Sequence, residues 1–81
     1  MKREDVYERL TRVFRDVFDD ETIELNDETV ADDIDGWDSF EHINLIVAIE
    51  EEFKFKIPMY RVTTMENVGE MVDVILDAKN K

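Results

Sequence analysis

Residues 35–41 read Asp-Gly-Trp-Asp-Ser-Phe-Glu, and the pattern of the chain changes at this stretch. Polar residues without periodicity dominate before it, whereas apolar residues recur at helical steps after it. Asp38 and Glu41 stand three residues apart at the change. This spacing lets Asp38 cap backbone N–H groups while Glu41 folds back to complete a capping box. The stretch therefore predicts a helix over residues 39–53, with Ser39 at its first position.

Ser39 is not needed as the cap of this helix, so its hydroxyl is free for another role. At a helix start, the unpaired N–H groups and the helix dipole favour a negative substituent such as a phosphodiester. Gly36 permits a sharp approach of the chain to this point. The residues alone thus predict a place suited to a phosphate group, although most serines at helix starts have a structural role only.

A long loop precedes this helix, and another amphipathic segment precedes the loop. Residues 3–18 carry apolar side chains at three- and four-residue steps and are predicted to be helical: Val6, Leu10, Val13, Phe14 and Val17. Residues 19–38 lack periodicity, but apolar side chains recur in them as expected anchors to the core: Ile23, Leu25, Val30 and Ile34. Loops of this length in compact domains tend to be functional or disordered.

The chain after residue 53 predicts a connector and a last helix. Pro58 disfavours a helical conformation at the residue before it, so we expect a connector with a short helical turn near Tyr60. Thr63 and Glu66 have the spacing of a capping box, with Thr64 as the alternative cap, and the helix continues to about residue 78. Gly69 is a mild weakness inside that helix. The expected core face of helix 39–53 consists of Ile43, Ile46, Ile49 and Phe53.

Length and composition restrict the class of protein. Eighty-one residues suit one small domain, residues 1–81, and the absence of cysteine together with a single histidine excludes disulfides and a structural zinc site. The N-terminal residues show no apolar leader, and no run approaches the roughly 20 residues that span a bilayer. We therefore expect a cytoplasmic, all-α bundle of three main helices that does not insert into membranes.

The charge is strongly negative and unevenly distributed. Twenty-two acids against ten bases give a net charge of −12, with fifteen Asp or Glu and no Lys or Arg between Asp16 and Phe53. This excess argues against nucleic acid and anionic membranes as partners and favours a basic patch on another protein. It also favours a monomer.

The residues around Ser39 resemble the acyl carrier protein family. Asp38-Ser39-Phe40, the acidic helix ending in Glu-Glu-Phe at residues 51–53, and Ile57-Pro58 match the family's order of motifs along nearly the whole chain. The resemblance implies an acyl-carrier-like four-helix bundle with a short third helix and a long loop between the first two. It also implies a 4′-phosphopantetheine arm, which a phosphopantetheinyl transferase esterifies to Ser39 from coenzyme A. The arm's thiol would hold acyl groups as thioesters, so the protein would be a carrier and not an enzyme.

The resemblance also implies two sets of contact residues. Acyl-loading and acyl-processing enzymes with basic docking patches would contact the charged or apolar side chains of helix 39–53: Asp38, Phe40, Glu41, Val47, Glu50 and Glu51. An acyl cavity would be lined by deformable apolar side chains, for which ordinary core packing is the alternative: Ile46, Ile57, Met59, Val62, Met65 and Met71.

Three departures from the family pattern indicate a specialised carrier. Phe40 stands where leucine is common, Asn44 stands where many fatty-acid carriers have an acid, and His42 is unusual beside the serine. Only residues 59–62 separate Ile57-Pro58 from the threonine pair, so the third helix should be shorter than in housekeeping carriers and should carry Arg61 in place of acids. We therefore expect a carrier for fatty-acid, modified-lipid or polyketide-type biosynthesis with a dedicated pathway.

Four other classes of protein are compared with this expectation. An EF-hand with Gly36 at its sixth position would begin at Ala31 and end at His42, where carboxylates are required, so no metal site is predicted. A hydrolase pairing Ser39 with His42 lacks an orienting group and an oxyanion hole, so no catalytic residue is assigned. An unmodified acidic helical adaptor, and an amino-acyl carrier of the D-alanyl or peptidyl type, remain as alternatives.

Overall fold

Four α-helices and one short 3-10 helix make up the secondary structure of residues 1–79, the part of the chain that the computed structural model describes. Their bounds are α1 Arg3–Phe18, the 3-10 helix η1 Ala31–Asp33, α2 Ser39–Phe53, α3 Met59–Val62 and α4 Val68–Lys79. The described residues contain no strand. The predicted all-α bundle of three main helices plus a short third helix is confirmed, and the bounds predicted for α1 and α2 are those observed.

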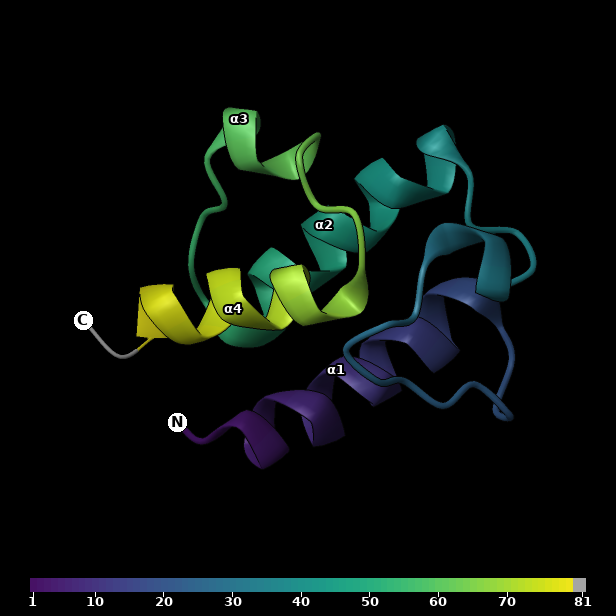
Figure 1. Cartoon of the computed structure of the whole chain (residues 1–81), viewed down its shortest axis with the longest axis horizontal. Helices are drawn as coiled ribbons and strands as arrows, with labels where there is room; N and C mark the ends of the chain where they lie inside the picture. Colours follow the sequence, from purple (N-terminus) through teal and green to yellow (C-terminus); the bar gives the residue numbers. More distant parts are fainter. Residues whose placement is uncertain (80–81) are drawn as a thin grey trace.

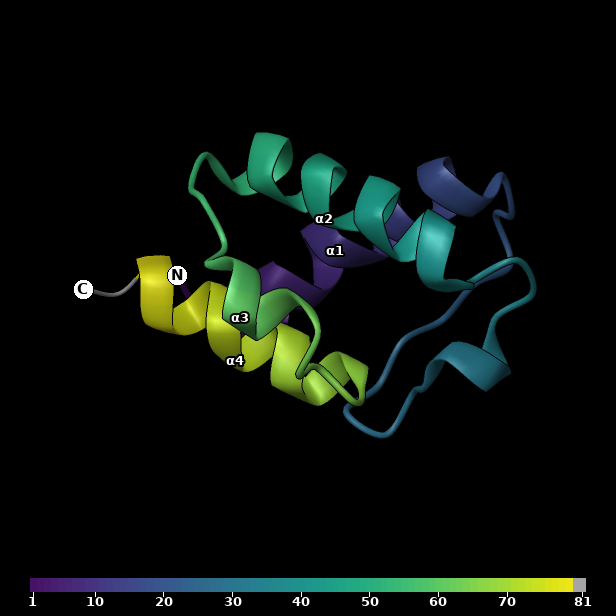
Figure 2. The same cartoon turned by 90° about the horizontal axis from the view of Figure 1, so that it is seen from above.

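The core lies where α1 packs against both α2 and α4 (Figures 1 and 2). The start of α1 and the end of α4 lie at one end of the molecule, and the long loop covers the other. The side chains buried in this core come from every helix except η1, and from the connecting segments: Val6, Leu10, Val13, Phe14, Ile23, Ile34, Leu45, Ile46, Ile49, Phe53, Ile57, Val62, Val68, Met71, Val72, Val74 and Ile75.

One core residue of α2 was wrongly predicted. Ile43 is 51% exposed, whereas Leu45 is completely buried. The observed core positions Leu45, Ile46, Ile49 and Phe53 recur at helical steps on one face, and position 43 lies to the side of that face. Ile43 therefore faces the space between α2 and the connector to α4, where it lines a cavity described below.

The long loop is tied to the start of α4 by backbone hydrogen bonds. The Val68 N–H donates to the Thr29 carbonyl at 2.8 Å, and the Gly69 N–H donates to the Asp27 carbonyl at 3.0 Å. The predicted anchoring is confirmed, because Ile23 and Ile34 are buried and the other two predicted anchors are half-buried. The loop also contains the helix η1, which the sequence did not predict.

The predicted start of α4 is wrong. The helix begins at Val68, and its cap is Asn67, whose Oδ1 accepts the Glu70 N–H at 2.9 Å. The Glu70 carboxylate in turn accepts the Glu66 N–H at 2.7 Å. Glu70 therefore takes the role predicted for Glu66, which was expected to accept a backbone N–H just before the helix. The loop carbonyls already satisfy the first two N–H groups of α4, and this tertiary contact fixes where the helix begins.

Gly69 is required by a close approach of two backbones. A Cβ at this position would lie 2.9 Å from the Asp27 carbonyl oxygen and 3.1 Å from the Asp27 Cα. Gly69→Ala should therefore destabilise the fold by about 1–3 kcal/mol, although alanine is the better helix former by roughly 1 kcal/mol. Urea unfolding would measure the change. A stabilised Gly69→Ala variant would contradict the close contact, and Gly69→Ser should be destabilised at least as much.

The side chain of Asp27 joins α1 to the loop. Its Oδ1 accepts a hydrogen bond from the Tyr7 hydroxyl and another from Arg3 at 2.8 Å, and Arg3 also pairs with Asp73 of α4 at 2.8 Å. The hydrogen bond from Tyr7, followed by that from Arg3, lowers the pKa of Asp27. Burial, followed by the hydrogen bond to Asp27, raises the pKa of Tyr7 to about 12.

A lowered pKa of Asp27 predicts acid-sensitive stability. The stability that the ionised Asp27 carboxylate contributes is complete above the pKa of an unfolded aspartate, about 3.9. It is lost as the pH falls through the lower pKa of Asp27 in the folded state. Asp27→Asn should therefore flatten the acid limb of a plot of unfolding free energy against pH. Glu24→Gln, which neutralises an exposed acid with no hydrogen-bond partner among the described residues, is the control. Equal acid limbs for the wild type and Asp27→Asn would contradict this role.

Candidate functional site

The start of α2 presents Ser39 to solvent. Asp38 caps the helix, because its Oδ1 accepts the Glu41 N–H at 2.8 Å, and Ser39 is the first helical residue and is exposed. The N–H groups of Ser39 and Phe40 have no acceptor among residues 1–79. Two backbone donors and the positive end of the helix dipole therefore lie beside an exposed hydroxyl that takes no part in capping.

The second half of the predicted capping box is wrong. The Asp38 N–H donates to the Gly36 carbonyl at 3.1 Å, and the Glu41 carboxylate instead accepts from the Asn44 side chain at 3.0 Å. Gly36 has a φ of +88°, a conformation that favours glycine and turns the chain just before the helix. The predicted sharp turn at Gly36 is therefore confirmed, and it supplies the acceptor that Glu41 was expected to provide.

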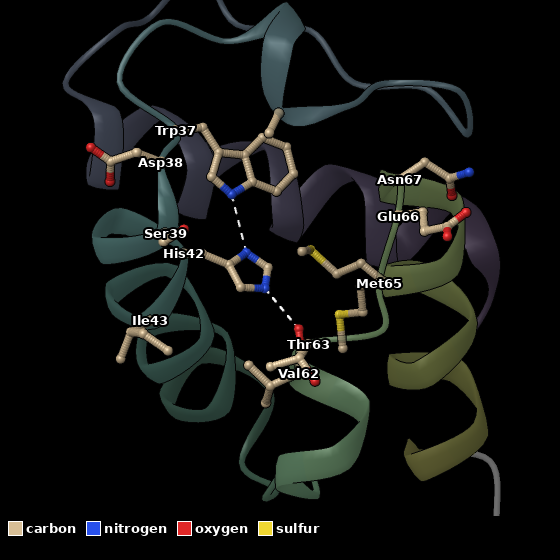
Figure 3. A pocket seen from close by; sticks show the side chains of 12 residues that line it. Trp37, Asp38, Ser39, His42, Ile43, Val62, Thr63, Met65, Glu66 and Asn67 are labelled. Carbon is tan, nitrogen blue, oxygen red and sulfur yellow. Dashed lines mark hydrogen bonds between the residues drawn. The ribbon is translucent and has the colours of Figure 1, made fainter.

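A cavity of about 530 Å³ opens beside Ser39 (Figure 3). It is open to solvent, and its lining comes from η1, the segment before α2, α2, the end of α3, the connector after it and α4: Ala31, Trp37, Asp38, Ser39, His42, Ile43, Val62, Thr63, Met65, Glu66, Asn67 and Met71. Most of its wall is apolar, and Met65 faces His42 across it (Figure 3). A flexible group attached at Ser39 would have this cavity directly beside it.

His42 and Trp37 form a polar link in the wall of this cavity. The Trp37 Nε1–H donates to His42 Nδ1 at 3.1 Å, and His42 Nε2 lies 2.9 Å from the Val62 carbonyl oxygen (Figure 3). The Trp37 indole also packs edge-on against Phe14, with centroids 5.2 Å apart. The sequence analysis assigned no role to Trp37, and no local pattern connects it with His42.

The residues predicted to line an acyl cavity fall into three groups. Val62, Met65 and Met71 line the cavity beside Ser39. Ile46 and Ile57 are buried in the core and do not line it. Met59 is 77% exposed on α3, outside the cavity. The geometry thus brings half of the predicted set together and adds Trp37, His42 and Ile43 to it, among others.

The side chains predicted to contact partners differ in their solvent exposure and in their hydrogen bonds. Phe40, Ile43 and Val47 form an exposed apolar stripe on α2, with Phe40 74% exposed. Asp38 and Glu51 are exposed beside it, and Glu41 is half-buried. The carboxylate of Glu50 is half-buried and accepts the Ile57 N–H at 2.7 Å, so it holds the connector after α2.

Two comparisons with known proteins match this arrangement. The family described as "Phosphopantetheine attachment site" matches residues 8–75 of the chain. The solution NMR structure of a holo acyl carrier protein from Geobacter metallireducens superimposes with a TM-score of 0.84 at 42% sequence identity, over 93% of this chain and 88% of that one. The chain belongs to the acyl carrier protein family. Acyl carrier proteins are carriers and not enzymes, and their prosthetic group is 4′-phosphopantetheine.

The start of α2 fits the prosthetic group of an acyl carrier protein. A phosphodiester there would accept hydrogen bonds from the two N–H groups that have no acceptor, and the helix dipole would stabilise its charge. Gly36 turns the chain just before this helix start, and the apolar cavity lies beside Ser39, where a flexible arm could enter it. No described residue with a positive charge lines the cavity, so backbone donors would carry this recognition.

The arrangement does not suit the hydrolase alternative. Both ring nitrogens of His42 are engaged, one by Trp37 and the other by the Val62 carbonyl, so neither is positioned to take the Ser39 proton.

No helix among the described residues is both long and apolar enough to cross a bilayer. Acyl carrier proteins interact with phosphopantetheinyl transferases and acyl-processing enzymes.

Proposed function

We propose that Ser39 is the attachment residue of this acyl carrier protein and that the arm attached there carries acyl intermediates as thioesters. The observation that carries the proposal is the exposed Ser39 hydroxyl at the first residue of α2, free of capping and beside an apolar cavity. In the loading reaction, Ser39 Oγ loses its proton and attacks the phosphorus that bears the pantetheine in coenzyme A; the pyrophosphate P–O bond breaks, 3′,5′-ADP leaves, and a phosphodiester to Ser39 remains. The thiol of the bound group then loses its proton and attacks the carbonyl of an activated acyl donor, whose leaving group departs as the thioester forms.

The exposed face of α2 is proposed as the surface that partner enzymes contact. Its apolar stripe of Phe40, Ile43 and Val47 lies among acids, and the molecule as a whole is strongly negative. A partner with a basic rim around an apolar patch would complement this surface, and charge attraction would raise its association rate. Asp38, Glu41 and Glu51 are the acids proposed to meet that rim; Glu50 is partly committed to the Ile57 N–H.

The pathway is proposed to be a dedicated one, such as modified-lipid, polyketide-type or secondary-metabolite biosynthesis. The support is α3, which has only four residues, exposes Met59 and Tyr60, and carries Arg61 without any acid. A partner selected for an acidic third helix would find a different surface here. Loading and elongation by a housekeeping fatty-acid synthase as efficient as with its own carrier would contradict this proposal. Faster loading by an amino-acid-activating ligase would instead favour an amino-acyl carrier.

Mass spectrometry tests the attachment residue. The purified chain is incubated with coenzyme A and a broad-specificity phosphopantetheinyl transferase, and its intact mass is then measured. We expect the mass to rise by one phosphopantetheine, and proteolytic mapping should place the added mass on the peptide that contains Ser39. If a folded sample does not react with an active transferase, the unmodified acidic adaptor becomes the better explanation. Added mass on another peptide would move the attachment site.

A further inference from the structure

The hydrogen-bond partners of His42 define the tautomer of its neutral ring in the wall of the cavity. The indole N–H of Trp37 can only donate and the carbonyl of Val62 can only accept, so His42 Nδ1 is the acceptor and Nε2 carries the hydrogen. The two bonds, at 3.1 and 2.9 Å, use both nitrogens of the neutral ring. The imidazole lies edge to edge with the indole, with centroids 6.0 Å apart and planes only 19° apart.

Through these bonds His42 connects three parts of the fold. It belongs to α2, Trp37 belongs to the segment that leads into α2, and Val62 is the last residue of α3. The indole of Trp37 also packs edge-on against the ring of Phe14 in α1. By contrast, α3 has one turn, a single buried side chain, Val62, and two widely exposed ones. Among the described residues, the bond between His42 and the Val62 carbonyl is the only hydrogen bond that joins α3 to α2.

We propose that His42 is a positioning residue that latches α3 to α2 across the cavity and thereby limits the size of the acyl group that the cavity admits. The inference rests on the proposed attachment at Ser39, which lies on the same wall one helical turn before His42. A small group fits beside the imidazole with both bonds intact. A bulkier group displaces α3, and this movement breaks the bond between His42 and the Val62 carbonyl.

Protonation of the imidazole affects the two bonds differently, because a protonated ring donates from both nitrogens. The bond to Val62 survives protonation, whereas the bond from Trp37 does not, since two N–H groups then oppose each other. The charged groups around the ring are Asp38 and Glu66, which line the same cavity, Glu41 beside it on α2, and Arg61 beside Val62 on α3. Acid should therefore release Trp37 while α3 stays attached.

The latch itself is tested on the unloaded protein, which makes this test independent of attachment at Ser39. Nitrogen-15 NMR should find the Nε2–H tautomer of His42 at neutral pH, and the Trp37 Nε1–H resonance should move as His42 is protonated. His42→Ala should speed hydrogen exchange in α3 about tenfold relative to α1, as expected for the loss of a net hydrogen bond. His42→Gln retains one donor and one acceptor, so it should keep slow exchange but lose the pH dependence at Trp37.

The size limit is tested on protein loaded with octanoyl or dodecanoyl phosphopantetheine, after mass spectrometry has verified loading of every variant. Cleavage by hydroxylamine reports how well the thioester is shielded. In the wild type we expect the dodecanoyl thioester to be cleaved faster than the octanoyl one, and in His42→Ala this difference should disappear. An equal chain-length dependence in both proteins, or none in the wild type, would overturn the proposal. So would the opposite tautomer of His42, or unchanged α3 exchange in His42→Ala.

Discussion

Ser39→Ala should abolish phosphopantetheine loading, so we expect the intact mass of the variant to stay that of the unmodified chain after incubation with coenzyme A and transferase. Alanine has no hydroxyl to form the phosphodiester. The fold should not change, because Ser39 is exposed and Asp38, not Ser39, caps α2. The helical circular dichroism spectrum and the urea midpoint should therefore match those of the wild type, which separates loss of the acceptor from loss of the fold.

Thr63→Ala is the matched control for this variant. Thr63 places a second exposed hydroxyl on the opposite wall of the same cavity, so it has the same access to solvent. It lies in the turn after α3 and lacks the helix start that surrounds Ser39. Loading of Thr63→Ala should be complete. A mass increase in Ser39→Ala, or its loss in Thr63→Ala, would show that the helix start is not the attachment site.

Leu45→Ala should cost about 2–5 kcal/mol of unfolding free energy, the range for removing a fully buried leucine. Leu45 is completely buried between α2 and the other helices. Native proteins have a total stability of about 5–15 kcal/mol, so a loss of this size should clearly lower the urea midpoint. Urea unfolding followed by circular dichroism measures the difference from the wild type.

Ile43→Ala is the control for Leu45→Ala, because it removes a similar side chain from the exposed side of the same helix. Because half of the Ile43 surface is in water, Ile43→Ala should lower the unfolding free energy by less than about 1 kcal/mol. A larger loss of stability in Ile43→Ala than in Leu45→Ala would contradict the orientation of α2. The sequence analysis placed Ile43 in the core, so a large loss in Ile43→Ala would agree with that prediction and not with the structure.

Local sequence was enough to place α1 and α2. The apolar stripe of residues 3–18 has a single period, and Asp38 supplies a cap that needs no tertiary partner. The start of α4 was different, because carbonyls of Asp27 and Thr29 bind its first N–H groups from a loop about forty residues earlier in the chain. Thr63 offered a plausible cap, but nothing in its neighbourhood reveals that the loop already supplies the acceptors.

The candidate site divides in the same way. The exposed place of Ser39 at the start of α2 was predicted, because capping is a local matter and its spacing is visible in the sequence. Half of the predicted cavity lining was also correct, but the polar link in its wall was not predicted, since it depends on a side-chain bond between Trp37 and His42 and on the carbonyl of Val62, twenty residues after His42. A backbone carbonyl has no signature in the identity of its residue, so the link between α2 and α3 appears only once the helices are packed.

The contacts of Trp37 give the protein an intrinsic optical probe. Trp37 is the only tryptophan in the chain, and its indole lies between the ring of Phe14 and the imidazole of His42, close to Ser39. Excitation selective for indole therefore reports on this one location without a dye or a label. Emission intensity and wavelength would follow, in real time, whether the space beside the attachment helix is filled or empty, and whether the neighbouring imidazole is charged.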